Sequence, residues 1–169
     1  MSSLNQSMFE HLKSKVPKLQ RKINLNSKDI VIDIGSNDGT FLGFFDRKFK
    51  LIGVDPTIKK FQRFYRKDII KIPDFFSHKI VAKTLNKKKA KLITTISMFY
   101  DLPDPIKFVE DIYECLDKDG IWHLEQSYMP AMIKNFSYDT ICHEHIEYYS
   151  LKSIKFILDQ VGFKIIDIE

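Results

Sequence analysis

The chain has 169 residues, of which 44% are hydrophobic, including 14 Phe and 7 Tyr, and this composition predicts one domain with a core of its own. Charged residues make up 29% of the sequence, and no apolar run approaches the roughly 20 residues of a membrane span, so a membrane protein is excluded. The polar N-terminus has no signal-peptide pattern and two cysteines are too few for a disulfide scaffold, so we expect a cytoplasmic protein.

The charge is unevenly distributed along the chain. The net charge is +5, but the first 91 residues carry 21 Lys and Arg against 8 Asp and Glu, whereas the last 78 carry 6 against 14. A basic half can attract nucleic acid or a phosphorylated substrate. Because the basic residues are spread over several elements and only 87–89 is a true run, a solvated lysine surface is the favoured interpretation. Nucleic acid is therefore not the expected partner.

Hydrophobic spacing predicts helices that alternate with short apolar strands. In chain order, we expect a helix over 4–21 that Pro17 kinks or ends, and then strands at 29–34, 50–55, 68–72, 92–96, 121–125 and 163–168, with helices at 41–45, 58–65, 78–85, 104–116 and 150–161. This alternation predicts an α/β fold, a Rossmann-like, doubly wound, mostly parallel sheet of about six strands with helices on both faces. Ligands of such sheets bind beyond the carboxyl ends of the strands.

The turn after the first predicted strand, residues 33–39 (DIGSNDG), is the most informative segment. Gly35 allows a tight turn and Gly39 allows a close approach of the backbone to a ligand. Asp55 ends the second strand 20 residues after Gly35, at the spacing where a carboxylate binds ribose hydroxyls. A nicotinamide loop would have a third glycine, and the two acids of this loop would repel a pyrophosphate. The alternative is a glycine turn with an Asp that only ends a strand.

Further candidates follow the later strands. Asp74 and Phe75 come after the third strand, where an Asp can accept the exocyclic amine of adenine and a Phe can stack; the alternative is a loop Asp beside core aromatics. Ser97, Met98 and Tyr100 follow the fourth strand and should line the reaction centre, unless they pack in the core. Glu125 and then Tyr128 follow the fifth strand, so topology places them toward an acceptor pocket.

Residues 142–149 (CHEHIEYY) concentrate titratable side chains. A zinc site would need the helical His-Glu-x-x-His spacing, which is missing, so no metal is expected. The histidines could instead cap the helix that follows. General acid–base catalysis fits better, because a His titrates near neutral pH while a Glu or Tyr orients it or polarises a carbonyl.

Two of these segments resemble known families. The turn resembles the [DE]-x-G-x-G-x-G loop of class I S-adenosylmethionine (SAM) methyltransferases, with Asn37 in place of the central glycine. Residues 136–151 resemble the D-x-I-x-H-E-H-x-x-Y-[YF]-S-L signature of sugar C-methyltransferases, which act on nucleotide-linked keto-deoxysugars. Residues 4–8, 31–42 and 53–56 resemble the same family. The resemblance implies a helical cap segment at 1–28 and a SAM-binding methyltransferase domain at 29–169.

The resemblance also implies the roles of individual residues. His145 would be the base that forms an enolate beside the ketone, and Glu144 would orient it or face the carbonyl. The implied catalytic residues are His143, Glu144 and His145; the implied cofactor-binding residues are Asp33, Gly35, Ser36, Asn37, Gly39, Asp55, Pro56, Asp74, Phe75, Ser97 and Met98; the implied acceptor-binding residues are Tyr100, Glu125, Tyr128 and Tyr148. The cofactor would be SAM, with S-adenosylhomocysteine (SAH) as its product.

The sequence departs from the family pattern in several places. It lacks the N-terminal Cys cluster, the C-terminal domain and a seventh strand, and Asp101 stands where family members often have His. The expected partner is a small-molecule acceptor such as a nucleotide-sugar. Two alternatives stay open: an O- or N-methyltransferase acting on a small metabolite, and a truncated SAM-binding module without turnover. An exposed sheet edge would favour a homodimer.

Overall fold

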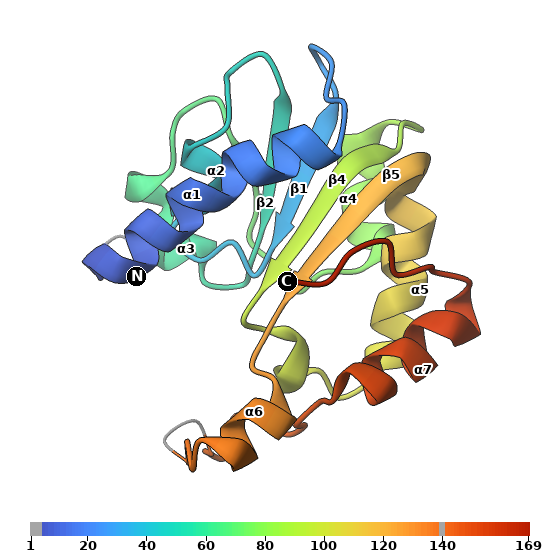
Figure 1. Ribbon diagram of the computed structural model, residues 1–169. Helices are drawn as coiled ribbons and strands as arrows, with labels where there is room; N and C mark the ends of the chain where they lie inside the picture. Colours follow the sequence, from blue (N-terminus) through green and yellow to red (C-terminus); the bar gives the residue numbers. More distant parts are fainter. Residues whose placement is uncertain (1–4, 139–140) are drawn as a thin grey trace.

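The computed structural model describes residues 5–138 and 141–169 and shows a parallel sheet between two layers of helices (Figure 1). In this part of the chain the sheet has five strands in the order β3-β2-β1-β4-β5. Every pair in it is parallel. Strand order reverses between β1 and β4, which is the switch point where such folds bind ligands. The strands are β1 (Ile30–Ile34), β2 (Lys50–Val54), β3 (Ile70–Ile72), β4 (Ala90–Ile96) and β5 (Leu116–Glu125).

The helices follow the strands as expected, with one addition after β5. Pro17 does not end the first helix. The helix begins after its cap, Asn5, and continues through Pro17 for 17 residues in all. None of the helices in the described ranges has the length and apolar character that a bilayer crossing needs. They are α1 (Gln6–Lys22), α2 (Thr40–Gly43), α3 (Ile58–Phe61), α4 (His78–Leu85), α5 (Pro105–Cys115), α6 (Met129–Lys134) and α7 (Leu151–Val161), with short 3-10 turns at Gln62–Phe64 and Phe99–Asp101.

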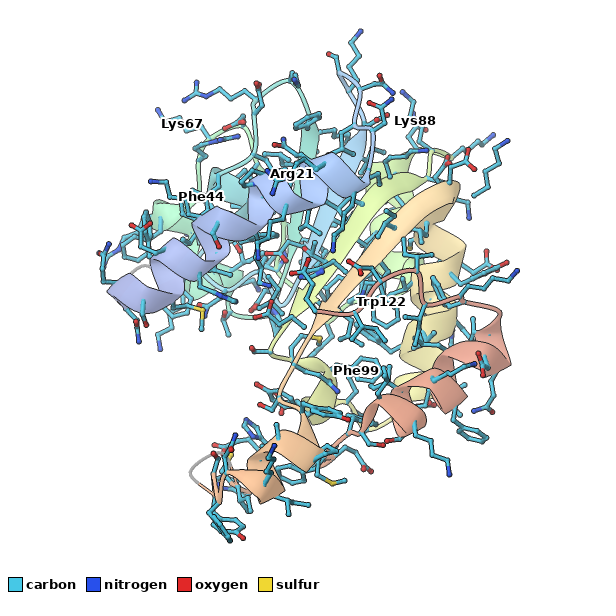
Figure 2. The ribbon with its side chains drawn as sticks, in the orientation of Figure 1. Arg21, Phe44, Lys67, Lys88, Phe99 and Trp122 are labelled. Carbon is cyan, nitrogen blue, oxygen red and sulfur yellow. The ribbon has the colours of Figure 1, made fainter. Side chains whose placement is uncertain are left out.

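Two apolar cores hold the layers together. Because side chains alternate along a strand, Ile32 of β1 points into a core with residues of α4, α5 and α7, whereas its neighbour Val31 joins α1, α2 and α3. Phe99 and Trp122 lie in the first of these cores with ring centroids 5.9 Å apart (Figure 2). The Rossmann-like fold with helices on both faces is confirmed.

The predicted strand at 163–168 is wrong, because this segment is held by its side chains rather than by a strand ladder. The Phe163 ring lies 5.6 Å from that of Trp122, and Lys22 of α1 pairs with both Asp167 and Glu169. Residues 163–169 form no strand, and they line a cavity of about 570 Å³ together with β5. The apolar residues of this segment suggested a strand, but a strand also requires a paired neighbour within about 5 Å.

Candidate active site

The turn after β1 needs glycine for two different reasons. Gly35, Asn37 and Gly39 all have positive φ, at 73°, 49° and 73°, and the N–H of Gly35 donates to the carbonyl of Val54 at 2.9 Å. A Cβ on Gly39 would lie 2.5 Å from the ring of Tyr65. The backbone conformation and the close neighbour therefore both exclude a larger residue at position 39.

Tyr65 holds the turn in place through its hydroxyl group. Its hydroxyl contacts Ser36 Oγ at 2.8 Å and donates to the carbonyl of Asn37 at 3.0 Å. Burial raises the pKa of Tyr65, so the hydroxyl keeps its proton and remains a donor. No local sequence pattern predicts this contact, which joins the turn to a residue 28 positions later. The turn is thus fixed by internal hydrogen bonds.

Asp55 faces the same turn from the end of β2. It is 8% exposed, and its Oδ2 accepts the N–H of Asn37 at 2.9 Å. Its Oδ1 accepts both the N–H and the hydroxyl of Thr57, each at 2.6 Å. A carboxylate offers about four acceptor sites, so an oriented Asp55 keeps capacity for a ligand hydroxyl.

Asp33 is a buried acid of the site, and its pKa is shifted from the ordinary value. It is 4% exposed and accepts the Thr94 hydroxyl at 2.6 Å. Burial raises its pKa from 3.8 to about 7, the bond from Thr94 opposes this shift, and the charge of Asp55 adds to it. A cation bound nearby would favour the ionised form of Asp33.

A cavity of about 430 Å³ opens above the turn. The Oδ1 of Asn37 is buried and has no hydrogen-bond partner among residues 5–138 and 141–169, so a ligand N–H or O–H would satisfy it. The residues of the predicted cofactor site that line the cavity are Asp33, Gly35, Ser36, Asn37, Asp55, Ser97 and Met98. Those that sequence reasoning did not assign to it are Met8, Leu12, Asp38, Phe41, Thr57, Phe61 and Ile96.

Four predicted cofactor residues lie outside this lining. Gly39 shapes the turn, while Pro56 is exposed beside Asp55. Asp74 accepts the N–H of Phe75, whose side chain is 74% exposed. The structure therefore brings Asp33 of β1 and Asp55 after β2 together, and it leaves Asp74 and Phe75 after β3 at the surface. Their adenine-binding role stays a prediction.

On the acceptor side, His145 packs against the segment that follows β4. Its ring centroid is 4.2 Å from that of Tyr100, and the N–H of Glu147 donates to the Tyr100 carbonyl at 3.1 Å. The Tyr100 hydroxyl in turn donates to the carbonyl of Ser97 at 2.9 Å. Since Ser97 and Met98 line the cofactor cavity, this chain of contacts connects the half-buried imidazole to it.

The other members of the His-Glu-His segment are more exposed. His143 and Glu144 form an ion pair at 3.3 Å, with side chains 91% and 65% exposed. Asp101 joins the group: burial raises its pKa, the charge of His145 lowers it and the charge of Glu144 raises it. Asp101 is thus close enough to His145 for their charges to interact, which the sequence did not predict.

The predicted acceptor-binding residues do not share one pocket. Glu125 and Tyr128 line the larger cavity of about 570 Å³, whereas Tyr100 lies beside His145 and Tyr148 is half-buried near it in sequence. The carbonyl of Glu125 accepts the Ser97 N–H at 2.8 Å and so ties the ends of β4 and β5 together. The acceptor role of these four residues stays a prediction.

A doubly wound parallel sheet with a glycine turn after β1 and a buried carboxylate after β2 defines a Rossmann-like domain that binds a nucleoside-containing cofactor. A family model described as "Methyltransferase domain" matches residues 4–168, and the chain therefore belongs to the methyltransferase domain family. The cofactor of this domain is S-adenosylmethionine.

The similar proteins include two kinds of transferase. The chain is 27% identical over 164 residues to "C-methyltransferase NovU" of Streptomyces niveus, covering 96% of this chain and 39% of NovU. It is 33% identical over 105 residues to the tRNA U34 carboxymethyltransferase of Campylobacter lari, covering 59% of this chain and 36% of that protein. The chain thus spans less than half the length of these two relatives.

Solved structures share the fold. A SAM-dependent methyltransferase from Archaeoglobus fulgidus superposes with a TM-score of 0.69 at 18% identity, over 92% of this chain and 69% of that one. The plantazolicin methyltransferase BpumL, solved with SAH, gives 0.66 at 14% identity, over 90% of this chain and 62% of that one.

The residues that line the 430 Å³ cavity fit SAM. SAM is a nucleoside with ribose hydroxyls, an ammonium and a sulfonium cation, and Asp55 and Asp33 are the acceptor and the charge partner that these groups require. The buried Asn37 Oδ1 offers one more acceptor. The absence of a side chain at Gly35 keeps space open beside Met98, since a Cβ at this position would lie only 3.1 Å from Met98 Cγ.

Proposed function

We propose that the chain carries the SAM-dependent C-methyltransferase activity that its motifs predict, acting on the carbon next to the carbonyl of a keto-sugar or a related small molecule. The observation that carries the proposal is the packing of half-buried His145 on Tyr100, directly beyond the Ser97–Met98 wall of the cofactor cavity. The similarity to NovU over 96% of this chain supports carbon as the methylated atom.

His145 acts as the base. It takes the proton from the carbon beside the carbonyl, and the electron pair moves to the carbonyl oxygen to give an enolate. When bound, SAM supplies an electrophilic methyl group on its sulfonium. The enolate carbon forms the new bond to this methyl group, while the carbon–sulfur bond breaks and its electron pair stays on sulfur. The Tyr100 ring fixes the imidazole, and the charge of nearby Asp101 stabilises it once protonated.

The test separates enolisation from methyl transfer. The purified chain is incubated in D₂O with a nucleotide-linked keto-deoxysugar without SAM, and we expect deuterium to enter at the carbon beside the ketone. With SAM, we expect a product heavier by one methyl group, with the label on carbon by NMR. Deuterium incorporation that does not require His145, or a methyl group found on oxygen or nitrogen, would contradict the proposal.

RNA is a second candidate acceptor, which the tRNA U34 carboxymethyltransferase relatives and the basic first half of the chain favour. The placement of the lysines argues for the small molecule instead. Lys67 and Lys88 precede β3 and β4, so they lie at the amino ends of the strands, whereas the cofactor cavity lies at the carboxyl ends (Figure 2). Transfer of a radioactive methyl group from SAM to bulk tRNA, at a rate above that for the keto-sugar, would establish the second candidate.

A homodimer through the sheet edge is part of the same proposal. The five-stranded sheet ends in β3 and β5, and an edge strand offers backbone groups to another chain. Sedimentation at micromolar concentration checks this, and a monomer at all concentrations would contradict it.

A further inference from the structure

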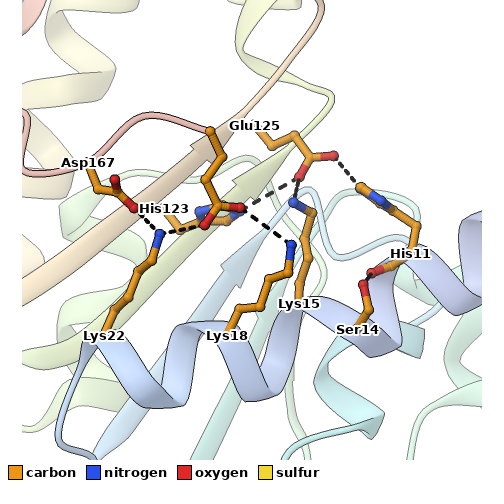
Figure 3. A network of polar contacts seen from close by, with 9 residues as sticks. His11, Ser14, Lys15, Lys18, Lys22, His123, Glu125 and Asp167 are labelled. Carbon is orange, nitrogen blue, oxygen red and sulfur yellow. Dashed lines mark hydrogen bonds and ion pairs between the residues drawn. The ribbon is translucent and has the colours of Figure 1, made fainter.

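A group of charged side chains joins α1 to the end of β5 (Figure 3). Glu125, the last residue of β5, contacts His11 Nε2 at 2.6 Å and forms an ion pair with Lys15, both on α1. His123, two residues earlier on β5, adds a third contact at 3.7 Å. We call these four side chains the Glu125 cluster.

The carboxylate and the ammonium of the Glu125 cluster are partly shielded from water, although His11 is 45% exposed. The side chains of Glu125 and Lys15 are only 25% and 13% exposed. Burial by itself raises the pKa of Glu125, but the polar contacts with His123, Lys15 and His11 outweigh it and lower the pKa to about 2. The carboxylate is therefore ionised throughout the neutral range, and loss of either partner leaves a partly buried charge unpaired.

The same face of α1 carries two walls of the cofactor cavity. Met8 and Leu12 line it, and His11 and Lys15 follow them at positions three and seven after Met8. Residues at i, i+3, i+4 and i+7 share one face of a helix. A contact that fixes His11 and Lys15 therefore also fixes how far Met8 and Leu12 extend over the cofactor.

The other end of α1 has a second set of ion pairs that differs in character. Lys22 pairs with Asp167 and with Glu169, and Lys18 lies 3.6 Å from Glu169. These side chains are between 37% and 54% exposed, and exposed pairs contribute little to stability. They also lie about two turns or more beyond the residues that line the cofactor cavity, so they provide a matched control.

We propose that Glu125 is a positioning residue for cofactor binding: it holds α1 through His11 and Lys15, so that Met8 and Leu12 close the SAM cavity. Glu125 does not line that cavity, so its effect on the cofactor is indirect and passes through the position of α1. The inference concerns the cofactor alone and does not depend on the identity of the acceptor.

The test is SAM binding by calorimetry to four proteins: wild type, Glu125→Gln, Lys15→Met and the double variant. The loss of one charge-assisted contact should weaken binding about tenfold in each single variant. Because both act through one contact, the double variant should bind no more weakly than the weaker single variant. Amide hydrogen exchange of residues 6–15 should speed up in all three.

The controls are Asp167→Asn and Lys22→Met, which remove the same kinds of charge at the far end of α1, and both should keep SAM affinity within about twofold of wild type. Turnover adds a further readout: at saturating SAM, Lys15→Met should recover kcat while its KM for SAM stays raised. Unchanged affinity in Glu125→Gln, equal losses in the controls, or additive losses in the double variant would each overturn the proposal. If Glu125→Gln does not fold, the comparison of Lys15→Met with Lys22→Met decides.

Binding also separates this inference from the proposed function. If wild type binds SAM and Glu125→Gln binds it weakly, the positioning role stands even when no keto-sugar is methylated. If the acceptor is methylated normally but the variants bind SAM as wild type does, the proposed function stands and the positioning role is wrong.

Discussion

Two groups of polar side chains near the carboxyl ends of the strands differ in how they are held. The cofactor side is the 430 Å³ cavity with Asp33 and Asp55, and the acceptor side is the His-Glu-His segment, residues 143–145. Asp33, Ser36 and Asp55 are all at most 8% exposed, and each has a hydrogen-bond partner within the fold. On the acceptor side, His143 and Glu144 are 91% and 65% exposed and contact each other. The first group is preorganised, so it is ready to bind before any ligand arrives, whereas the second is largely in contact with solvent.

This difference separates binding from chemistry. Variants on the buried side should change the affinity for SAM, and variants on the exposed side should change turnover while leaving SAM affinity intact. Each prediction below is chosen to break or sharpen that separation.

The largest expected effect is the loss of turnover in His145→Ala. Removal of a general base costs about 10²- to 10⁴-fold in rate, while the dissociation constant for SAM should stay within a factor of two because His145 does not line the cofactor cavity. Single-turnover kinetics and calorimetry measure the two quantities. Equal losses in both would show that His145 supports the fold of the acceptor side instead.

Next comes a matched pair of acids, one after β2 and one after β3. Asp55→Asn should weaken SAM binding by tenfold or more, since it removes a buried carboxylate that accepts from the turn. Asp74→Asn should change it less than threefold, because Asp74 is exposed and accepts the N–H of its exposed neighbour Phe75. A large loss in Asp74→Asn would support the adenine-binding role that the sequence predicts.

A smaller effect concerns the pH dependence of SAM binding through Asp33. Its pKa in the fold is about 7, so a cationic cofactor should bind more tightly as the pH rises from 6 to 8 and should release protons on binding near pH 7. Calorimetry in buffers of different ionisation enthalpy measures the release, which Asp33→Asn should abolish. Proton uptake by wild type would contradict the prediction.

Asp33 should also affect stability with a definite sign. Because its pKa is raised from 3.8 to about 7, its contribution to stability is complete below the unfolded value and is lost as the pH rises through 7. The urea midpoint of wild type should therefore fall more between pH 5 and pH 8 than that of Asp33→Asn. Parallel curves for the two proteins would show that Asp33 does not titrate in this range.

The smallest expected effect is that of Asp101→Asn on the acceptor side. The charge of His145 lowers the pKa of Asp101, so the two side chains interact, and neutralising Asp101 should lower kcat less than threefold and leave SAM affinity unchanged. Steady-state kinetics and calorimetry measure the two quantities. An unchanged kcat would separate Asp101 from the base.

The fold was largely predictable because each signal was local. Strand β1 is a run of β-branched residues, α5 has Asp104 as its cap with Pro105 in its first turn, and Gly162 closes α7. The strand at 163–168 was predicted wrongly because the apolar residues of a segment do not show whether a neighbouring strand pairs with it. The early start of β5, at Leu116, was missed for the same reason, since it depends on pairing with Ala90.

The candidate site divides along the same line. Asp33 near the end of β1 and Asp55 after β2 could be located because topology brings strand ends together. The contacts of Tyr65 with the turn and of His11 with Glu125 could not, because each joins elements that are distant in sequence. The structure places both His11 and His123 against a partly buried carboxylate, and no local pattern in the sequence predicts either contact.

The ring of Tyr65 fills space that two glycines leave empty. A Cβ on Gly39 would lie 2.5 Å from it, and one on Gly53 would lie 3.0 Å from it. These three positions should therefore change together among descendants of this chain, because a side chain at either glycine demands a smaller residue at 65. Loss of the tyrosine would also remove the hydroxyl that fixes the turn, so the lineage can vary here only by rebuilding its cofactor turn.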